Sequence, residues 1–309
     1  MSIIKIEDVA HVRFRAPDLD AMEAYLLDFG LVRAARDGSR LFMRGSGNGA
    51  FLHATEQGEP GFAAVGFRAA SLDDLRTLAK SQEAAVEALD APGGGQVVRL
   101  TDPDGFTVEV VAGQEGAPPL ALPAREAAND ARRKDRLNQL KRVVPGPAHV
   151  LRLGHCVLNV GNFRVSEAWY KERFGFITSD EIYAGAKENV LGAFLRCDRG
   201  ATPTDHHTLF LAGLGHAGFN HAAFEVADMD DLMAGNAHLQ ATERRHEWGV
   251  GRHLLGSQIF DYWRDPWGHT LEHWTDGDLL SADWGSRSAA INELAGLQWG
   301  PPMPPTMGR

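Results

Sequence analysis

The strongest constraint on the fold is an internal repeat, because four segments of the first half of the chain recur in the same order in the second half. The spacing between partners grows slowly along the chain, as it does when one copy carries longer loops. We infer that the chain contains two copies of one unit. The matched pairs are VAHVRF (9–14) with LGHCVL (153–158), AMEAYLLDFGL (21–31) with SEAWYKERFGF (166–176), GFAAVGFRAASLDDL (61–75) with GFNHAAFEVADMDDL (218–232), and TDPDGFTVEVV (101–111) with RDPWGHTLEHW (264–274).

Each copy combines the patterns of strands and helices. Apolar alternation predicts strands, an apolar helical period ending in Phe-Gly predicts a capped helix, and Asp-Pro-x-Gly predicts a turn before a strand. The sequence therefore predicts an α+β fold of two tandem modules. We expect the modules at 1–113 and 150–280, joined by a linker with one helix at 114–149, and a proline-rich tail at 281–309 that packs on the surface or on a neighbouring subunit of a homo-oligomer.

Composition excludes several classes of function. With 31 basic and 41 acidic residues the net charge is −10, which repels phosphate backbones and argues against nucleic acid as a partner. No apolar run is long enough to span a bilayer and the start does not resemble a signal peptide, so we expect a cytoplasmic protein without a membrane partner. Cys156 and Cys197 are too few for a disulfide framework or a thiolate zinc site, so nitrogen and oxygen atoms must hold any metal.

Three polar residues of the second copy stand in short apolar strands: His155, His221 and Glu272. Burying such groups is costly unless they are paired or bound to metal. A lone histidine of this kind is more often a satisfied core residue, but three at homologous places of a repeat favour a metal. Two histidines and one carboxylate suit non-haem Fe(II), although Zn²⁺ and Mn²⁺ accept the same donors. The first copy lacks the middle donor, because its corresponding residues are His11, Ala64 and Glu109.

Three further residues could take part in chemistry: His206 in TDHHTLFL, His253 in GVGRHLLGSQ and Tyr262 in FDYWRDPWG. An imidazole can move protons near neutral pH, and a tyrosine hydroxyl can hydrogen-bond a substrate oxygen. Each also has an ordinary structural interpretation, as a strand end, a loop histidine or a core tyrosine. Strand alternation is expected to turn His207 and His273 to the opposite faces.

The repeat, together with the motifs LGHCVL, DHHTL, FNHAAFEV and GRHLLGSQIFDYWRDPWGHTLEHW, resembles the type I extradiol catechol dioxygenases of the vicinal oxygen chelate superfamily over nearly the whole chain. The module alone is weakly specific, since glyoxalases and antibiotic-resistance proteins share it. The chain departs from the family at Asn220, where a His-His pair is usual. The resemblance implies two βαβββ units per module, iron held by His155, His221 and Glu272, His206 beside the O₂ position, and His253 and Tyr262 on substrate oxygens.

The activity that this resemblance implies is Fe(II)-dependent cleavage of a catechol beside its vicinal hydroxyls with both atoms of O₂, in the catabolism of aromatic hydrocarbons; Mn(II) is an alternative metal. A glyoxalase-like isomerase or lyase, or a non-catalytic module that binds an aromatic compound or drug, are the alternatives. Glyoxalases commonly split their ligands between modules, which Ala64 makes awkward. The sequence does not identify the catechol, and Phe194, Trp248 and Trp263 could line a ring pocket or simply pack in the core.

Overall fold

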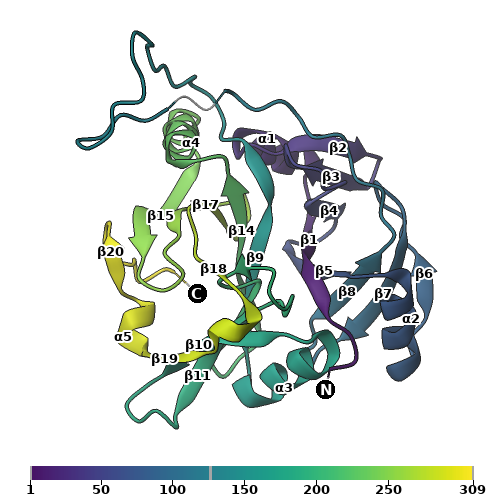
Figure 1. Ribbon diagram of the computed structural model, residues 1–309. Coiled ribbons are helices and arrows are strands. Elements are labelled where there is room, and N and C mark those ends of the chain that lie inside the picture. Colours follow the sequence, from purple (N-terminus) through teal and green to yellow (C-terminus); the bar gives the residue numbers. More distant parts are fainter. Residues whose placement is uncertain (1, 125–126, 308–309) are drawn as a thin grey trace.

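The computed structural model describes residues 2–124 and 127–307. Its first module is a single eight-stranded sheet with two helices (Figure 1). The elements are β1 (Ile6–Ala16), α1 (Leu19–Asp28), β2 (Val32–Arg36), β3 (Arg40–Arg44), β4 (His53–Gln57), β5 (Gly61–Ala69), α2 (Leu72–Ser81), β6 (Val86–Ala88), β7 (Gln96–Thr101) and β8 (Thr107–Ala112). The chain thus runs βαβββ twice, and the strands lie in the order β2-β3-β4-β1-β5-β8-β7-β6.

The second module repeats this plan with additional strands. Its elements are β9 (Val150–Val160), α3 (Phe163–Phe174), β10 (Ile177–Tyr183), β11 (Val190–Arg196), β12 (Thr204–Asp205), β13 (Leu209–Gly213), β14 (Gly218–Val226), α4 (Met229–Ala241), β15 (Arg245–His253), β16 (Ile259–Arg264), β17 (Thr270–Thr275), β18 (Leu279–Leu280), a 3₁₀ turn (Ala282–Trp284), β19 (Arg287–Ala290), α5 (Ile291–Leu294) and β20 (Leu297–Trp299). The main sheet has the order β19-β10-β11-β13-β9-β14-β17-β16-β15-β20, while β12 pairs with β18. The α+β prediction, with paired βαβββ units, is confirmed.

The helix ends carry capping residues, and the Phe-Gly pattern predicts one of them, Gly175. Ser71 and Asp228 precede α2 and α4, and their side chains accept hydrogen bonds from the backbone N–H groups of Asp74 and Asp231. These bonds satisfy donors that a helix N-terminus leaves without partners. Gly175 ends α3 with φ = 70°, a left-handed conformation that glycine adopts without a steric penalty.

The two Asp-Pro-x-Gly segments form equivalent turns. Asp102 accepts from the backbone of Phe106 at 2.8 Å before β8, and Asp265 accepts from the backbone of His269 at 2.9 Å before β17. Such Asx-type bonds stabilise a tight turn. Each turn leads into a strand that carries a buried glutamate, and in this way the repeat positions corresponding side chains in the two modules.

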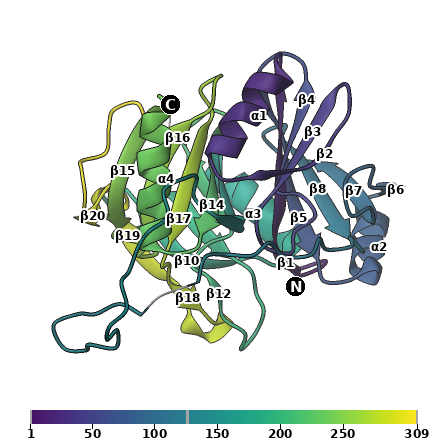
Figure 2. The same cartoon turned by 90° about the horizontal axis from the view of Figure 1, so that it is seen from above.

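The modules share one continuous apolar core, and their first strands, β1 and β9, lie beside each other at the centre (Figure 1). Figure 2 shows the two modules side by side from above. Phe62 stacks on Phe219 with ring centroids 4.6 Å apart, and the Tyr170 hydroxyl donates to Asp102 at 2.9 Å. Smaller apolar clusters occupy the other face of each sheet. Among the described residues, no helix is long and apolar enough to cross a membrane.

The predicted linker helix is absent from the described part of the linker, residues 114–124 and 127–149. Residues 125 and 126 lie outside the described residues. Leu137 and Leu140 are 79% and 73% exposed, so this stretch buries no apolar face against the modules. A helix of this length is marginal in water without such packing, which explains the error.

The C-terminal segment is more regular than its prolines suggested. β19 pairs with β10 and β20 pairs with β15, so residues 287–299 supply both edge strands of the second sheet. The prolines are confined to 300–307, where the described residues form neither helix nor strand. We propose 1–113 and 150–280 as module bounds, with the first part of the tail completing the second sheet.

Candidate metal centre and cavity

The three candidate ligands converge from three adjacent strands of the second module. His155 lies on β9, His221 on β14 and Glu272 on β17. Their ligand atoms lie within 4.8 Å of one another, and all three side chains are buried. Nε2 of His155 lies 3.3 Å from Oε2 of Glu272, and Nε2 of His221 lies 3.4 Å from the same oxygen.

The donor set fits a divalent cation. Neither carboxylate oxygen of Glu272 makes a hydrogen bond to the described residues, although Glu272 is completely buried. Burial raises the pKa of this carboxyl, but the two adjacent imidazoles lower it by more, so the group is an anion at neutral pH. Two ligands about 2.1 Å from one metal, at right angles, are about 3 Å apart, close to the observed separations. A buried anion without hydrogen bonds is costly unless a cation binds it.

Asn220 orients one of the two histidines. The His221 Nδ1–H donates to the Asn220 Oδ1 at 2.7 Å, and the Asn220 amide donates to Asn159 at 3.0 Å. With Nδ1 occupied, the lone pair of Nε2 is directed toward Glu272, the tautomer that a metal ligand needs. Asn220, which stands where the family usually has a histidine, therefore provides a hydrogen-bonding partner for His221.

His253 and Tyr262 lie beside these residues, as predicted. His253 is the last residue of β15 rather than a loop residue, and Tyr262 on β16 pairs directly with Glu272 on β17. Nε2 of His253 lies 2.9 Å from the Tyr262 hydroxyl and 3.9 Å from Oε1 of Glu272. Burial lowers the pKa of His253 to about 4 and raises the pKa of Tyr262 well above 10, so both are neutral near pH 7.

The predicted orientation of the histidine pair 206–207 is wrong. His207 reaches the cavity and packs on His155, with ring centroids 4.0 Å apart. His206 points away from it, and its Nε2–H donates to Asp180 at 2.6 Å. The pair lies in a bend between β12 and β13, which breaks the two-residue alternation on which the prediction depended. The two Nδ1 atoms lie 3.1 Å apart, so one imidazole donates to the other.

A cavity of about 250 Å³ is lined by His155, His207, His221, His253 and Tyr262. Of the three aromatic residues proposed for a ring pocket, Phe194 and Trp248 line this cavity. Trp263 does not, because it is fully buried in the core and its indole N–H donates to Asp261 at 2.6 Å. His273 also points away from the cavity, as predicted, since its Nε2–H donates to the carbonyl of Phe29 at 2.7 Å.

One wall of the cavity comes from the C-terminal segment, which sequence reasoning did not connect with the site. Leu294, Met303 and Met307 line the cavity. The Trp248 indole N–H donates to the Pro301 carbonyl at 2.8 Å and thereby holds the segment against the sheet. No motif marks these residues, because their role depends on the path of the chain after β18.

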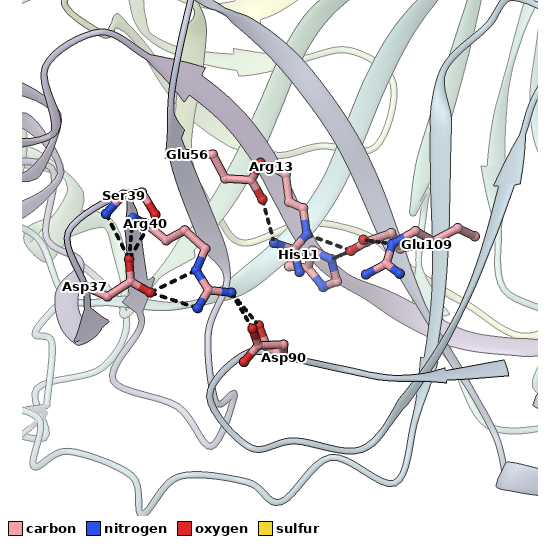
Figure 3. Close-up of polar contacts among 9 residues, drawn as sticks. His11, Arg13, Asp37, Ser39, Arg40, Glu56, Asp90 and Glu109 are labelled. Atoms are coloured by element: carbon pink, nitrogen blue, oxygen red, sulfur yellow. Dashed lines mark hydrogen bonds and ion pairs between the residues drawn. The ribbon is translucent and has the colours of Figure 1, made fainter.

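The corresponding place in the first module holds ion pairs (Figure 3). Nε2–H of His11 donates to Glu109 Oε2 at 2.6 Å, and the Arg13 guanidinium donates to the same oxygen at 2.7 Å. Arg99 donates to the other carboxylate oxygen at 2.9 Å. Glu109, unlike Glu272, is therefore saturated with donors from the protein itself.

The strand register shows which residues differ between the two modules at corresponding positions. Arg13 pairs with Ala64 across β1 and β5, whereas in the second module Val157 pairs with His221. The missing ligand is thus accompanied by an arginine on the facing strand, and its guanidinium supplies the positive charge beside the carboxylate. In the described part of the first module no three metal-ligating atoms cluster.

Comparison with known proteins supports this picture. Residues 152–273 match the Glyoxalase/Bleomycin resistance protein/Dioxygenase superfamily. Metapyrocatechase 2 of Cupriavidus necator is 28% identical over 305 residues, which cover 97% of this chain and 90% of that protein. Homoprotocatechuate 2,3-dioxygenase from Arthrobacter globiformis superposes with a TM-score of 0.80 at 20% identity, over 99% of this chain and 91% of that chain.

A second solved structure, the Mn(II)-bound glyoxalase from Novosphingobium aromaticivorans, superposes with a TM-score of 0.77 at 22% identity, over 99% of this chain and 95% of that chain. At these identities the solved structures establish the fold alone. The match to the superfamily and the similarity to metapyrocatechase 2 confirm the resemblance that the sequence motifs indicated.

Proposed function

We propose that this chain, whose residues 152–273 form a domain of the glyoxalase and dioxygenase superfamily, is an extradiol ring-cleaving dioxygenase. The reaction would break the ring bond beside the two hydroxyls of a catechol and insert both atoms of O₂. A hydroxymuconic semialdehyde or related keto acid would form, with no external reductant because the catechol supplies the electrons. The observation that supports this best is one cavity that is lined by both histidines of the buried His155–His221–Glu272 cluster together with His207, His253 and Tyr262.

Fe(II) is the metal that we assign to His155, His221 and Glu272, because this donor set contains no thiolate and suits non-haem iron. When bound, the metal would act as a Lewis acid toward the catechol and mediate electron transfer between the ring and O₂. Mn(II) remains the alternative. Asn220 would hold His221 in the ligating tautomer, as its 2.7 Å hydrogen bond suggests.

His253 and Tyr262 would bind the substrate hydroxyls. A neutral imidazole can accept the proton of a catechol hydroxyl, and the adjacent Tyr262 hydroxyl, 2.9 Å away, can donate to the resulting oxygen. The low pKa of His253 keeps the ring neutral near pH 7, so it can accept a hydrogen bond from a substrate hydroxyl. These two residues thus orient the substrate and hold one mobile proton.

His207 would take the role that the resemblance implied for His206. The His207 imidazole lies against both His155 and Phe194, with ring centroids 4.0 and 4.7 Å away. It would therefore face the part of the cavity where the substrate ring and O₂ meet. There an imidazole can donate a hydrogen bond to a partly negative oxygen and transfer a proton. His206 and Asp180 would position His207 from behind through the 3.1 Å contact between the two rings.

The alternative functions are less well supported. A glyoxalase with ligands shared between modules would need donors from the first module, but Glu109 there is ion-paired with Arg13 at 2.7 Å. A module that only sequesters an aromatic compound has no need for a completely buried carboxylate without hydrogen bonds.

Oxygen uptake tests the proposal directly. The protein is first loaded with ferrous iron and ascorbate under argon. In air-saturated buffer it is then expected to consume one O₂ per catechol and to form a yellow product. Anaerobic samples, chelator-treated samples and the Glu272→Ala variant serve as controls and should be inactive. Full activity with stoichiometric zinc and no iron, or isomerase activity without O₂ uptake, would contradict the proposal.

Assembly and location remain proposals as well. Trp284 and Trp299 of the C-terminal segment are 59% and 42% exposed, which supports a homo-oligomer that covers them. Light scattering of the purified protein would measure the assembly, and a monomer at micromolar concentration would argue against it. We also propose a cytoplasmic enzyme of aromatic hydrocarbon catabolism.

A further inference from the structure

We propose that the cavity selects an uncharged catechol with an apolar substituent and rejects catechols that carry a carboxylate. This inference rests on the proposed function and adds the substrate class. It comes from the composition of the cavity walls beyond the candidate metal ligands. No lysine, arginine, aspartate or glutamate is among the described residues that line the cavity.

One wall is made of aliphatic and aromatic side chains on the first strands of the module. Phe194 stacks on Phe210 with centroids 4.2 Å apart, and both rings belong to one apolar cluster with Val157. Leu255 and Leu294 pack against this cluster at its border. A ring substituent placed against this cluster would contact apolar side chains.

A second group of lining residues is also largely apolar. Trp248 stacks on Tyr262 with centroids 5.4 Å apart and the planes at 13°. Met307 packs against this aromatic cluster, and Met303 completes the mouth, where it is 46% exposed. Methionine adapts to irregular apolar groups, which suits a wall that accepts substituents of different shapes.

The polar and charged groups close to the cavity already have partners. The Asn220 amide is bonded to Asn159 and His221, as described above. On β15, Arg252 donates to Asp276 at 2.7 Å and to the Ser257 carbonyl at 2.7 Å. Among the described lining residues, Gln258 is the remaining polar side chain outside the candidate site, and an amide can bind a hydroxyl but does not neutralise a carboxylate.

A carboxylate on the substrate would therefore lose its hydration without gaining a counter-ion from the described lining residues. Moving an anion into such surroundings is strongly unfavourable, whereas an alkyl or aryl substituent gains free energy by leaving water. A methyl ester has nearly the same shape as the corresponding acid but no charge, so comparing the two isolates the electrostatic contribution.

The test uses the wild-type iron-loaded protein with catechol, 4-ethylcatechol, methyl 3,4-dihydroxyphenylacetate and 3,4-dihydroxyphenylacetate. The kcat/KM of the acid is expected to be lower than that of its methyl ester by on the order of 100-fold. Anaerobic calorimetry should give the same ranking in Kd. An acid that is cleaved and bound as well as its ester would overturn the inference while leaving the proposed function intact.

Failure of the proposed function gives a different result. If no catechol is cleaved, ring cleavage is refuted, and the anaerobic Kd values still decide whether the cavity prefers uncharged ligands.

A positive charge introduced at the cavity mouth provides a second test of the inference. Met303→Lys is expected to raise the kcat/KM ratio of acid to ester at least about tenfold, because the ammonium supplies the missing counter-ion at an exposed position that tolerates it. Met303→Gln, which has a polar side chain but no charge, is expected to keep that ratio near the wild-type value. Equal ratios in the two variants would argue against the electrostatic explanation.

Discussion

Glu109 and Glu272 occupy matching strand positions in the two modules, and exchanging each for glutamine should have opposite effects. Glu109 accepts from His11, Arg13 and Arg99 at 2.6, 2.7 and 2.9 Å. Glu272 makes no hydrogen bond to the described residues. The first carboxylate therefore contributes to folding by itself, whereas the second contributes only when a cation is bound.

Glu109→Gln removes the anion opposite Arg13, which is itself buried. Breaking a buried ion pair costs about 3–5 kcal/mol. The lower end applies here, because Arg99 is partly exposed and Arg13 also lies 3.6 Å from Glu56. In a cooperative unit of about 150–250 residues, about 3 kcal/mol corresponds to a decrease of roughly 6–12 °C in the melting temperature, and the decrease is smaller in a larger unit. Iron content should remain at the wild-type value.

Glu272→Gln should abolish metal binding, because one of three ligands is lost. In chelator-treated protein the same substitution removes a buried charge that lacks hydrogen bonds, so its melting temperature should equal or exceed that of metal-free wild type. Calorimetry with and without chelator, together with metal analysis, measures both effects. Loss of iron from folded Glu109→Gln would mean that the metal is shared between modules, and an unchanged melting temperature would refute the structural role of the Arg13 pair.

Three other predictions address the cavity and the first module. His207→Phe should keep iron and lower kcat on the order of 10²–10⁴-fold. His206→Phe should mainly lower thermal stability. A larger loss of kcat in His206→Phe than in His207→Phe would support the role first expected for His206. Asn220→Ala should weaken metal affinity roughly 10–100-fold in a chelator competition, because His221 loses its hydrogen bond, and an unchanged affinity would contradict this. Burial raises the pKa of Glu109, but its hydrogen-bonding and cationic partners lower it by more, below the ordinary 4.5. Its stabilisation is therefore complete above about pH 4.5 and is lost as the pH falls toward the lower folded-state pKa, so acid melts of Glu109→Gln should show a shallower pH dependence.

The repeat and the strand patterns were sufficient to predict the modules and the three candidate ligands. Matching positions in a duplicated sequence occupy matching strand registers, so His155 and Glu272 could be recognised as facing residues by comparison with His11 and Glu109. Helix ends were equally predictable, because caps and Asp-Pro-x-Gly turns depend on hydrogen bonds between residues close in sequence.

Other features depend on contacts between segments distant in sequence. Helix propensity in the linker did not produce a helix in its described part, because no neighbouring element covers Leu137 and Leu140. The prolines after β20 did not prevent Met303 and Met307 from forming a cavity wall, since Pro301 is held by Trp248.

By itself the sequence determined that two similar modules form and that the candidate set His155, His221 and Glu272 belongs to the second, since both properties follow from residue identity at repeated positions. Only the tertiary structure decided that His207 rather than His206 faces the cavity and that Arg13 supplies the charge beside Glu109. The reason is physical: a single bend reverses the face to which a side chain points, and an ion pair forms only where neighbouring strands bring its two groups together.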